Sequence, residues 1–235
     1  TSPWPTSASS GRPAANANAG VWLRGCFDSL TSWMRWSYLP PLMIYVAAGI
    51  SGLTAIVGTF FVKEHLGLSA EFLAALGFWA GIPWALKMPV GHLVDLLWRW
   101  KEMLVFLGAG MIAASLAIMI GLLESASWLP PWIGVEAWYV VSVLVAPLGY
   151  VVQDVVADAM TVEAVPLIDD AGQPLDRKTI KLMHTTMQTL GRVAIVGGGI
   201  LVSLANILMF SGVESMSKAQ KTAVYISIYE LALAI

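Results

Sequence analysis

Long apolar runs recur along this chain, and a run of about 20 residues is enough to cross the hydrocarbon core of a bilayer as a helix. Only 12% of the 235 residues are charged and 57% are hydrophobic, so a water-soluble globule would lack the polar side chains to cover its surface. The sequence therefore predicts an all-α, polytopic membrane protein in a lipid bilayer. The expected spans are 38–62, 70–96, 103–123, 135–162, 179–210 and 222–235.

The segments outside these runs have a different composition. Residues 1–20 are rich in Pro, Ser, Ala, Asn and Gly and predict a disordered tail. Residues 21–37 mix Trp and Leu with Arg and Asp, which indicates an interfacial amphipathic helix. The last run, 222–235, stops inside an apolar stretch. We therefore expect five complete spans, a truncated sixth, and a missing C-terminal half of the same protein as their partner.

The distribution of Lys and Arg predicts the orientation, because cytoplasmic loops carry an excess of both. With the N-terminus in the cytoplasm, the outer segments hold only Lys63, Lys218 and Lys221. The inner segments then hold Arg12, Arg24, Arg35, Arg99, Lys101, Arg177, Lys178 and Lys181. The net charge of -2 gives no reason to expect nucleic acid as a partner, and no motif indicates a cofactor or a metal.

Charged residues within apolar runs are costly, so each needs a partner, an aqueous cavity or a function. Asp154 and Asp158 are four residues apart and share one helical face. Two neighbouring carboxylates repel, so one of them could carry a proton or a cation could hold both ionised. Lys87 is expected at a similar depth in the second span, which makes a Lys87–Asp154 pair feasible. Such a pair serves either transport or only the fixing of helix register.

Arg192 is expected about 20 Å into the fifth span, near the bilayer midplane. A guanidinium there can bind a carboxylate or phosphate in bidentate fashion. Alternatively, Arg192 is a buried partner of Asp154 or Asp158. The second span also contains Gly77 and Gly81, whose spacing predicts a close helix contact.

At the inner end of the second span, Gly91 and Asp95 are four residues apart and Arg99 follows. This pattern resembles the loop signature of the major facilitator superfamily, although Leu96 and Trp98 replace a basic residue and a glycine of that signature. In the family this Asp belongs to a conformational latch, so the resemblance implies a gating role for Gly91, Asp95 and Arg99. The alternative is that Asp95 only caps and anchors its helix.

A closer resemblance joins the Pro-Trp-x-x-Lys-x-x-x-Gly-x-x-x-Asp pattern of residues 83–95 to the Asp-x-x-x-Asp-Ala pattern within 153–159. This combination looks like the folate–biopterin transporter family, and the muropeptide permeases and acetyl-CoA transporters are related to it. The resemblance implies the N-terminal six-helix bundle of a major facilitator fold, in which two such halves enclose a central cavity, often with proton coupling.

The leading hypothesis is a proton-coupled secondary transporter, a symporter or antiporter, of a small organic anion that is pterin- or folate-like or muropeptide-like. It would lie in the cell or inner membrane, with Arg192 and Lys87 attracting the anion and Asp154 or Asp158 carrying the proton. The alternative is a membrane assembly or delivery factor of the same fold that transports nothing. We do not expect the protein to be an enzyme, because the sequence contains no HExxH or GxSxG motif.

Overall fold

A computed structural model of the chain describes residues 36–61, 67–125, 128–130, 132–168 and 172–235. The expected tail 1–20 and nearly all of the expected amphipathic helix 21–37 lie outside these residues. From Ser37 onward the chain forms one unit. Helices dominate its described residues, and extended pairing among them is limited to one isolated bridge between Ile168 and Pro174. The prediction of an all-α fold is therefore confirmed.

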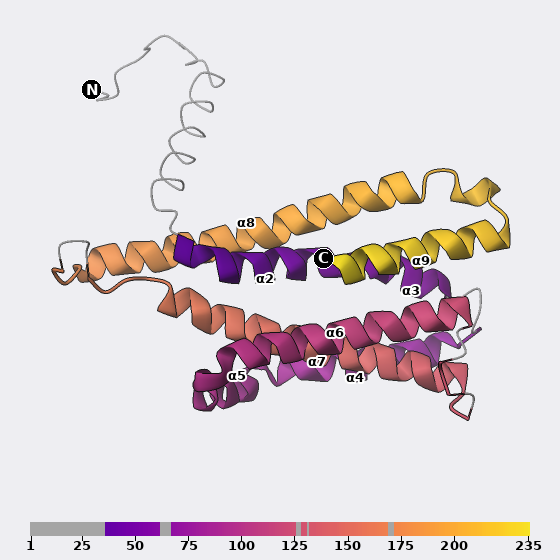
Figure 1. Ribbon diagram of the computed structural model, residues 1–235, viewed down its shortest axis with the longest axis horizontal. Helices are drawn as coiled ribbons and strands as arrows, with labels where there is room; N and C mark the ends of the chain where they lie inside the picture. Colours follow the sequence, from indigo (N-terminus) through magenta and orange to yellow (C-terminus); the bar gives the residue numbers. More distant parts are fainter. Residues whose placement is uncertain (1–35, 62–66, 126–127, 131, 169–171) are drawn as a thin grey trace, which may run out of the picture. The chain divides into compact units, whose positions relative to one another are not determined.

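The helices follow the apolar runs in order (Figure 1). The first run forms η1 (Trp36–Tyr38), α2 (Leu39–Ile50), the 3-10 turn η2 (Ser51–Thr54) and α3 (Ala55–Phe61). The second forms α4 (Ala70–Ala85), α5 (Lys87–Leu96) and η4 (Trp98–Trp100). The others form α6 (Lys101–Glu124), α7 (Val135–Glu163), α8 (Arg177–Met209), η5 (Val213–Ser215) and α9 (Lys218–Ala234).

Among the described residues, four helical stretches are long and apolar enough to cross a membrane, or five if α4 and α5 form one bent span. The helix α9 has 17 residues, which is too short to be counted with them. The chain is thus polytopic by length and composition, and the six-helix major facilitator bundle stays a prediction.

The second run bends by 42° between α4 and α5. Pro89 explains the position of the bend, because in a continuous helix its nitrogen would have to donate to the carbonyl of Ala85, and proline has no N–H. The new helix begins at Lys87, which places Pro89 in its first turn, where no intrahelical donor is needed. The sequence analysis expected a span at 70–96 but did not predict this bend.

Side-chain caps mark where several helices begin. The Ser69 hydroxyl accepts a hydrogen bond from the Phe72 amide at the start of α4, and Ser217 forms a capping box with Gln220 at the start of α9. At the start of α8, the Asp176 carboxylate accepts from the backbone amides of Lys178 and Thr179. A side-chain hydrogen bond with Thr179, followed by these backbone bonds, holds the pKa of Asp176 below its usual value.

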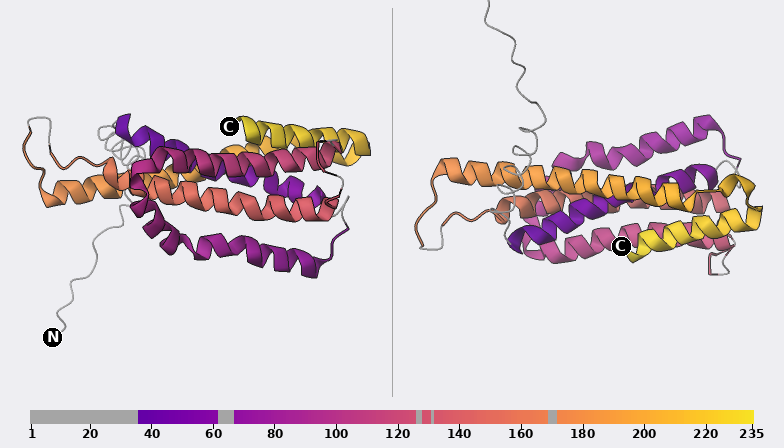
Figure 2. Two further views of the ribbon diagram at one scale, coloured as in Figure 1. Left: turned by 60° about the horizontal axis from the view of Figure 1, so that its bottom comes forward. Right: turned by 90° about the horizontal axis from the view of Figure 1, so that it is seen from above.

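Glycines allow α2 and α8 to pack closely along one another (Figures 1 and 2). A Cβ atom on Gly198 would lie 2.7 Å from the carbonyl oxygen of Val46 and 2.9 Å from the Cα of Gly49. A Cβ atom on Gly49 would in turn collide with the carbonyl oxygen of Ile195. Small residues are therefore required where these two backbones touch.

The second close pair is α6 with α7. A Cβ atom on Gly149 would lie 2.6 Å from the carbonyl oxygen of Gly108. Hydrogen bonds between Ser115 and Ser142, both buried, join the same two helices. By contrast, a Cβ atom on Gly77 or Gly81 would meet no described atom within 4 Å. The close approach that their spacing allows is therefore not seen among the described residues.

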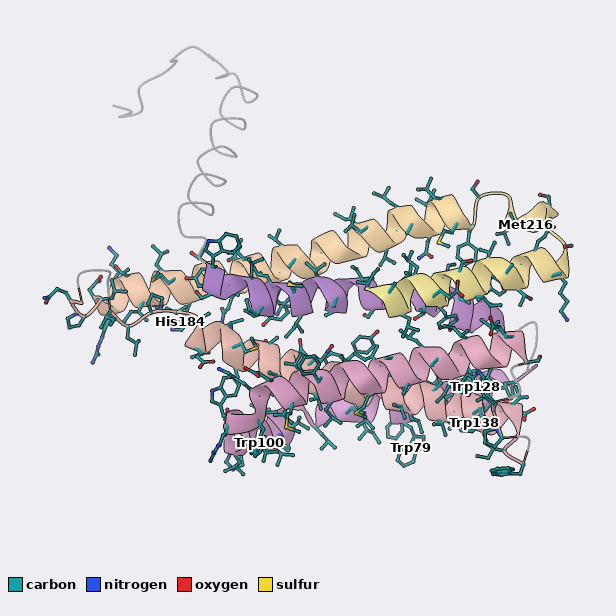
Figure 3. The ribbon with its side chains drawn as sticks, viewed as in Figure 1. Trp79, Trp100, Trp128, Trp138, His184 and Met216 are labelled. Atoms are coloured by element: carbon teal, nitrogen blue, oxygen red, sulfur yellow. The ribbon has the colours of Figure 1, made fainter. Side chains whose placement is uncertain are left out.

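Large apolar side chains cover the outer surface of the described helices. On α8 they form a stripe of Val193, Val196, Ile200, Leu204 and Ile207, each more than half exposed. On α6, Phe106 is 76% exposed. Figure 3 shows Trp100 near one end of the bundle and Trp128 and Trp138 near the other, as expected of aromatic belts at two membrane surfaces. This surface suits lipid rather than water.

Candidate functional site

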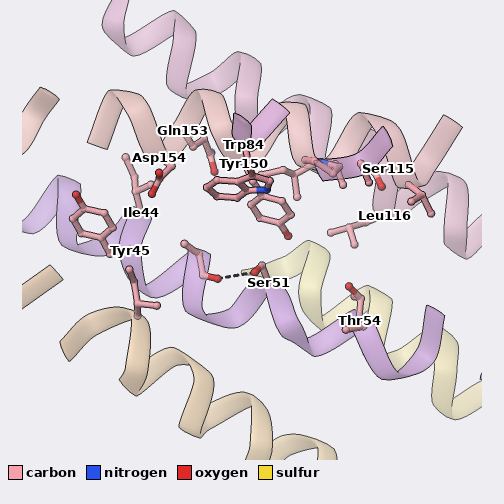
Figure 4. A pocket seen from close by; sticks show the side chains of 18 of the residues that line it. Ile44, Tyr45, Ser51, Thr54, Trp84, Ser115, Leu116, Tyr150, Gln153 and Asp154 are labelled. Atoms are coloured by element: carbon pink, nitrogen blue, oxygen red, sulfur yellow. Dashed lines mark hydrogen bonds between the residues drawn. The ribbon is translucent and has the colours of Figure 1, made fainter. Parts of the chain in front are cut away.

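A cavity of about 1220 Å³ lies between the helices of both close pairs and also reaches η2, α3, α4, α5 and α9. Its lining is polar in two regions. One region carries the charged side chains and the other carries hydroxyl groups from Ser51, Thr54, Ser115 and Ser142. Figure 4 shows Tyr45 and Asp154 toward one side, Trp84 and Tyr150 in the middle, and Ser115 and Thr54 toward the other side.

Lys87 is the centre of the charged region. Its Nζ lies 2.5 Å from Oδ2 of Asp154 and 2.8 Å from Oδ2 of Asp158. The spacing of the two aspartates on α7 explains this arrangement, because residues four apart face the same side of a helix. Lys87 reaches them from the first residue of α5, directly after the bend. The Lys87–Asp154 ion pair, which the sequence analysis considered feasible, is thus present. Asp158 pairs with the same lysine.

Tyr45 of α2 completes this cluster, and the sequence analysis missed it. Its hydroxyl donates a hydrogen bond to Oδ1 of Asp158 at 2.6 Å. Gly191 of α8 makes room for the Tyr45 ring, since a Cβ atom on Gly191 would lie 2.8 Å from the ring. A tyrosine within an apolar run was the only sequence signal. The cluster therefore joins α2, α5 and α7 through side chains, while α8 supports it through Gly191.

Arg192 lines the same cavity one residue after Gly191. The described ion pairs of Asp154 and Asp158 are made with Lys87, so the alternative that Arg192 is their buried partner is wrong. Within the described part of the chain, no carboxylate lies within ion-pair distance of Arg192. Arg192 is an exposed residue of the cavity lining, and its guanidinium remains able to bind an anion.

The two tryptophans of α4, Trp79 and Trp84, lie in different places. Trp84 lines the cavity. Trp79 is 60% exposed on α4, does not line the cavity and points away from the other helices in Figure 3. Only Trp84 is therefore placed to contact a molecule in the cavity.

The three residues expected to form a gate lie outside the cavity. Gly91 faces α7, where an added Cβ atom would lie 3.7 Å from Cγ1 of Val155, an ordinary contact. Asp95 and Arg99 are exposed and make no ion pair or side-chain hydrogen bond with any described residue. No described residue thus pairs with Asp95 through its side chain, and the gating role stays a prediction.

A different ion pair lies at this end of the bundle. Lys101, the first residue of α6, pairs with Glu163, the last residue of α7, at 2.5 Å. The same Nζ lies 4.9 Å from the centre of the Trp98 ring. The sequence analysis counted Lys101 only as an inner basic residue and did not single out Glu163. The pair ties α6 to α7 where the expected gate would act.

The fold and the cavity together define an integral membrane protein with ionised side chains in an internal cavity. Compared with known proteins, the chain is 32% identical over 132 residues to the "Folate-biopterin transporter" of Synechocystis sp.. The match covers 54% of this chain and 24% of that protein, so the chain spans about a quarter of the length of the relative it matches. No family model matches the chain, and no solved structure matches it significantly. The similarity supports a membrane transporter in general, rather than an enzyme.

Proposed function

We propose that this chain is part of a proton-coupled secondary transporter of a small organic anion, either pterin- or folate-like or muropeptide-like. One observation carries the proposal. In the cavity, both described carboxylates are paired with Lys87, while Arg192 has no described carboxylate partner. A guanidinium without a direct carboxylate partner in a cavity of this size suits a bound anion better than a purely structural network. The name of the Synechocystis relative is the reason for considering pterins and folates first.

In the proposed mechanism, Arg192 binds the carboxylate or phosphate of the substrate, and Lys87 adds positive charge nearby. Asp154 or Asp158 takes up the coupled proton. The described helices would form the N-terminal six-helix half of a major facilitator fold and would rock against a C-terminal half around a site near the midplane. Gly91, Asp95 and Arg99 would form the gate at one end of that movement.

We also propose that the protein lies in the cell or inner membrane with its N-terminus in the cytoplasm. The end of the bundle where α5 ends and α8 begins carries Arg99, Lys101, Arg177, Lys178 and Lys181. The described residues of the opposite end carry Lys218 and Lys221 at the start of α9. By the positive-inside rule, the first end faces the cytoplasm.

Replacing Arg192 by Gln in the full-length protein is expected to reduce anion uptake into proteoliposomes by about 10- to 100-fold. A hydrogen bond to a charged group contributes about 1.5–3 kcal/mol, and each 1.4 kcal/mol is a factor of ten in affinity. Uptake of labelled folate and of a muropeptide under an inward pH gradient measures this loss.

The matched control is Arg177→Gln, which removes an exposed guanidinium from the first residue of the same helix, outside the cavity. It should leave uptake unchanged. Equal uptake by the Arg192→Gln variant and the unmodified protein would contradict the proposed role. Absence of uptake for every anion, together with co-purification in a stable complex, would favour an assembly or delivery factor instead.

A further inference from the structure

The two aspartates of the cavity differ in their surroundings. The side chain of Asp154 is 14% exposed, and its described partner is Lys87. The side chain of Asp158 is 49% exposed and has two partners on different oxygen atoms. Lys87 contacts Oδ2, and the Tyr45 hydroxyl donates to Oδ1. Because Asp158 lines the cavity, water in the cavity can reach this carboxylate much more easily than that of Asp154.

This difference determines which carboxylate can accept a proton without disturbing the cluster. A proton arriving from cavity water at Oδ2 of Asp158 replaces the contact with Lys87 and neutralises the carboxylate. Oδ1 still accepts the hydrogen bond from Tyr45, and Lys87 still has the ionised Asp154 at 2.5 Å. No charge is left without a partner, which is the condition that a low-dielectric site imposes.

The charges around Asp158 also suggest how many protons accompany an anion. The groups that face it within the described part of the chain are Tyr45 from α2, Lys87 from α5, Asp154 from its own helix and Arg192 from α8. Two cations and two carboxylates give this cavity no net charge. A singly charged anion on Arg192 makes it negative, and one proton on Asp158 restores neutrality.

We propose that Asp158 is the proton-binding carboxylate of the cavity and takes up one proton for each singly charged anion bound at Arg192. Asp154 remains the ionised partner of Lys87, and Tyr45 is the residue that positions Asp158. This inference rests on the function proposed above, and it selects one of the two aspartates and fixes the charge balance of binding.

The test is calorimetric binding of pterin-6-carboxylate, a singly charged pterin, to the full-length protein in lipid nanodiscs. Titrations in buffers with different ionisation enthalpies give the number of protons taken up per bound anion. We expect about one proton for the unmodified protein and for the double variant Lys87→Met, Asp154→Asn, which removes one cation together with one carboxylate and so keeps the cavity neutral. We expect about none for Asp158→Asn. In Asp158→Glu, which keeps a titratable carboxyl group, the uptake should return to about one.

Tyr45→Phe tests positioning separately from folding. Above the pH at which Asp158 releases its proton, affinity should fall about tenfold per pH unit, the limiting slope for one coupled proton. The Tyr45 hydroxyl stabilises the ionised carboxylate, so its removal should move this pH profile to higher pH while the uptake stays near one proton. A purely structural role for Tyr45 would weaken binding equally at every pH.

The outcomes separate this inference from the proposed function. Anion binding without proton uptake, wild-type uptake in Asp158→Asn, or loss of uptake in the double variant Lys87→Met, Asp154→Asn would each overturn the assignment of Asp158 and leave anion transport standing. If the Asp158→Asn variant does not elute as a monodisperse protein, two other variants replace it: the double variant Lys87→Met, Asp154→Asn and the single variant Asp158→Glu. Both must retain an uptake of one proton. If the unmodified protein binds neither this probe, nor folate, nor a muropeptide, the proposed function fails and this inference fails with it.

Discussion

Replacing Lys87 by Met is expected to lower the free energy of unfolding by about 1–3 kcal/mol, because it leaves Asp154 and Asp158 facing each other without their cation. Loss of one partner of a fully buried pair costs about 3–5 kcal/mol. The expected value is smaller here because the Lys87 side chain is 38% exposed to the cavity. Reversible denaturation of the full-length protein in mixed micelles measures the change.

A second substitution separates charge from packing. In the double variant Lys87→Met, Asp154→Leu, one carboxylate remains, and Asp158 keeps its hydrogen bond from Tyr45. We expect most of the lost stability to return. Lys178→Met, which removes an exposed lysine near the start of α8, is the control and should change little. A double variant less stable than Lys87→Met alone would show that the ion pairs are not what holds these helices together.

The other large effect is expected at the contact between α2 and α8. Gly198→Ala places a Cβ atom 2.7 Å from the carbonyl oxygen of Val46 and 2.9 Å from the Cα of Gly49. Both neighbours are backbone atoms, so the helices must separate, and overpacking of this kind costs about 1–3 kcal/mol.

The chain provides matched controls on either side of Gly198. At Gly197 and Gly199 an added Cβ atom would meet no described atom within 4 Å. Alanine there should be neutral or slightly stabilising, because it favours the helix by up to about 1 kcal/mol relative to glycine. If all three alanine variants unfold at the same denaturant concentration, the close approach of α2 and α8 is contradicted.

The features that follow from helical periodicity could be predicted from the sequence. The apolar runs indicated helices because a bilayer leaves few alternatives for the backbone. Counting the rise per residue from Asp95 placed Lys87 near the depth of Asp154, and the ion pair is present. These arguments need only the positions of residues along one helix and the direction in which that helix runs.

Features that depend on which helices are neighbours could not be predicted. Nothing in the run around Tyr45 shows that α2 lies against Gly191 of α8, which is what directs the tyrosine toward Asp158. In the same way, the spacing of Gly77 and Gly81 resembles a packing motif, but no described helix lies against them. The expected gate at Asp95 has no described partner either, and its role stays a prediction.

Cysteine accessibility tests the central claim most directly, namely that the charged cluster lines a water-filled cavity while the apolar stripe on α8 faces lipid. On a Cys26→Ser background, single cysteines would replace Ala48 and Ala146, which line the cavity, and Val196 and Ile200, which belong to the stripe. A charged thiol reagent reacts only where water reaches the thiolate. We predict rapid labelling at 48 and 146 and almost none at 196 and 200, and the reverse pattern would contradict the account.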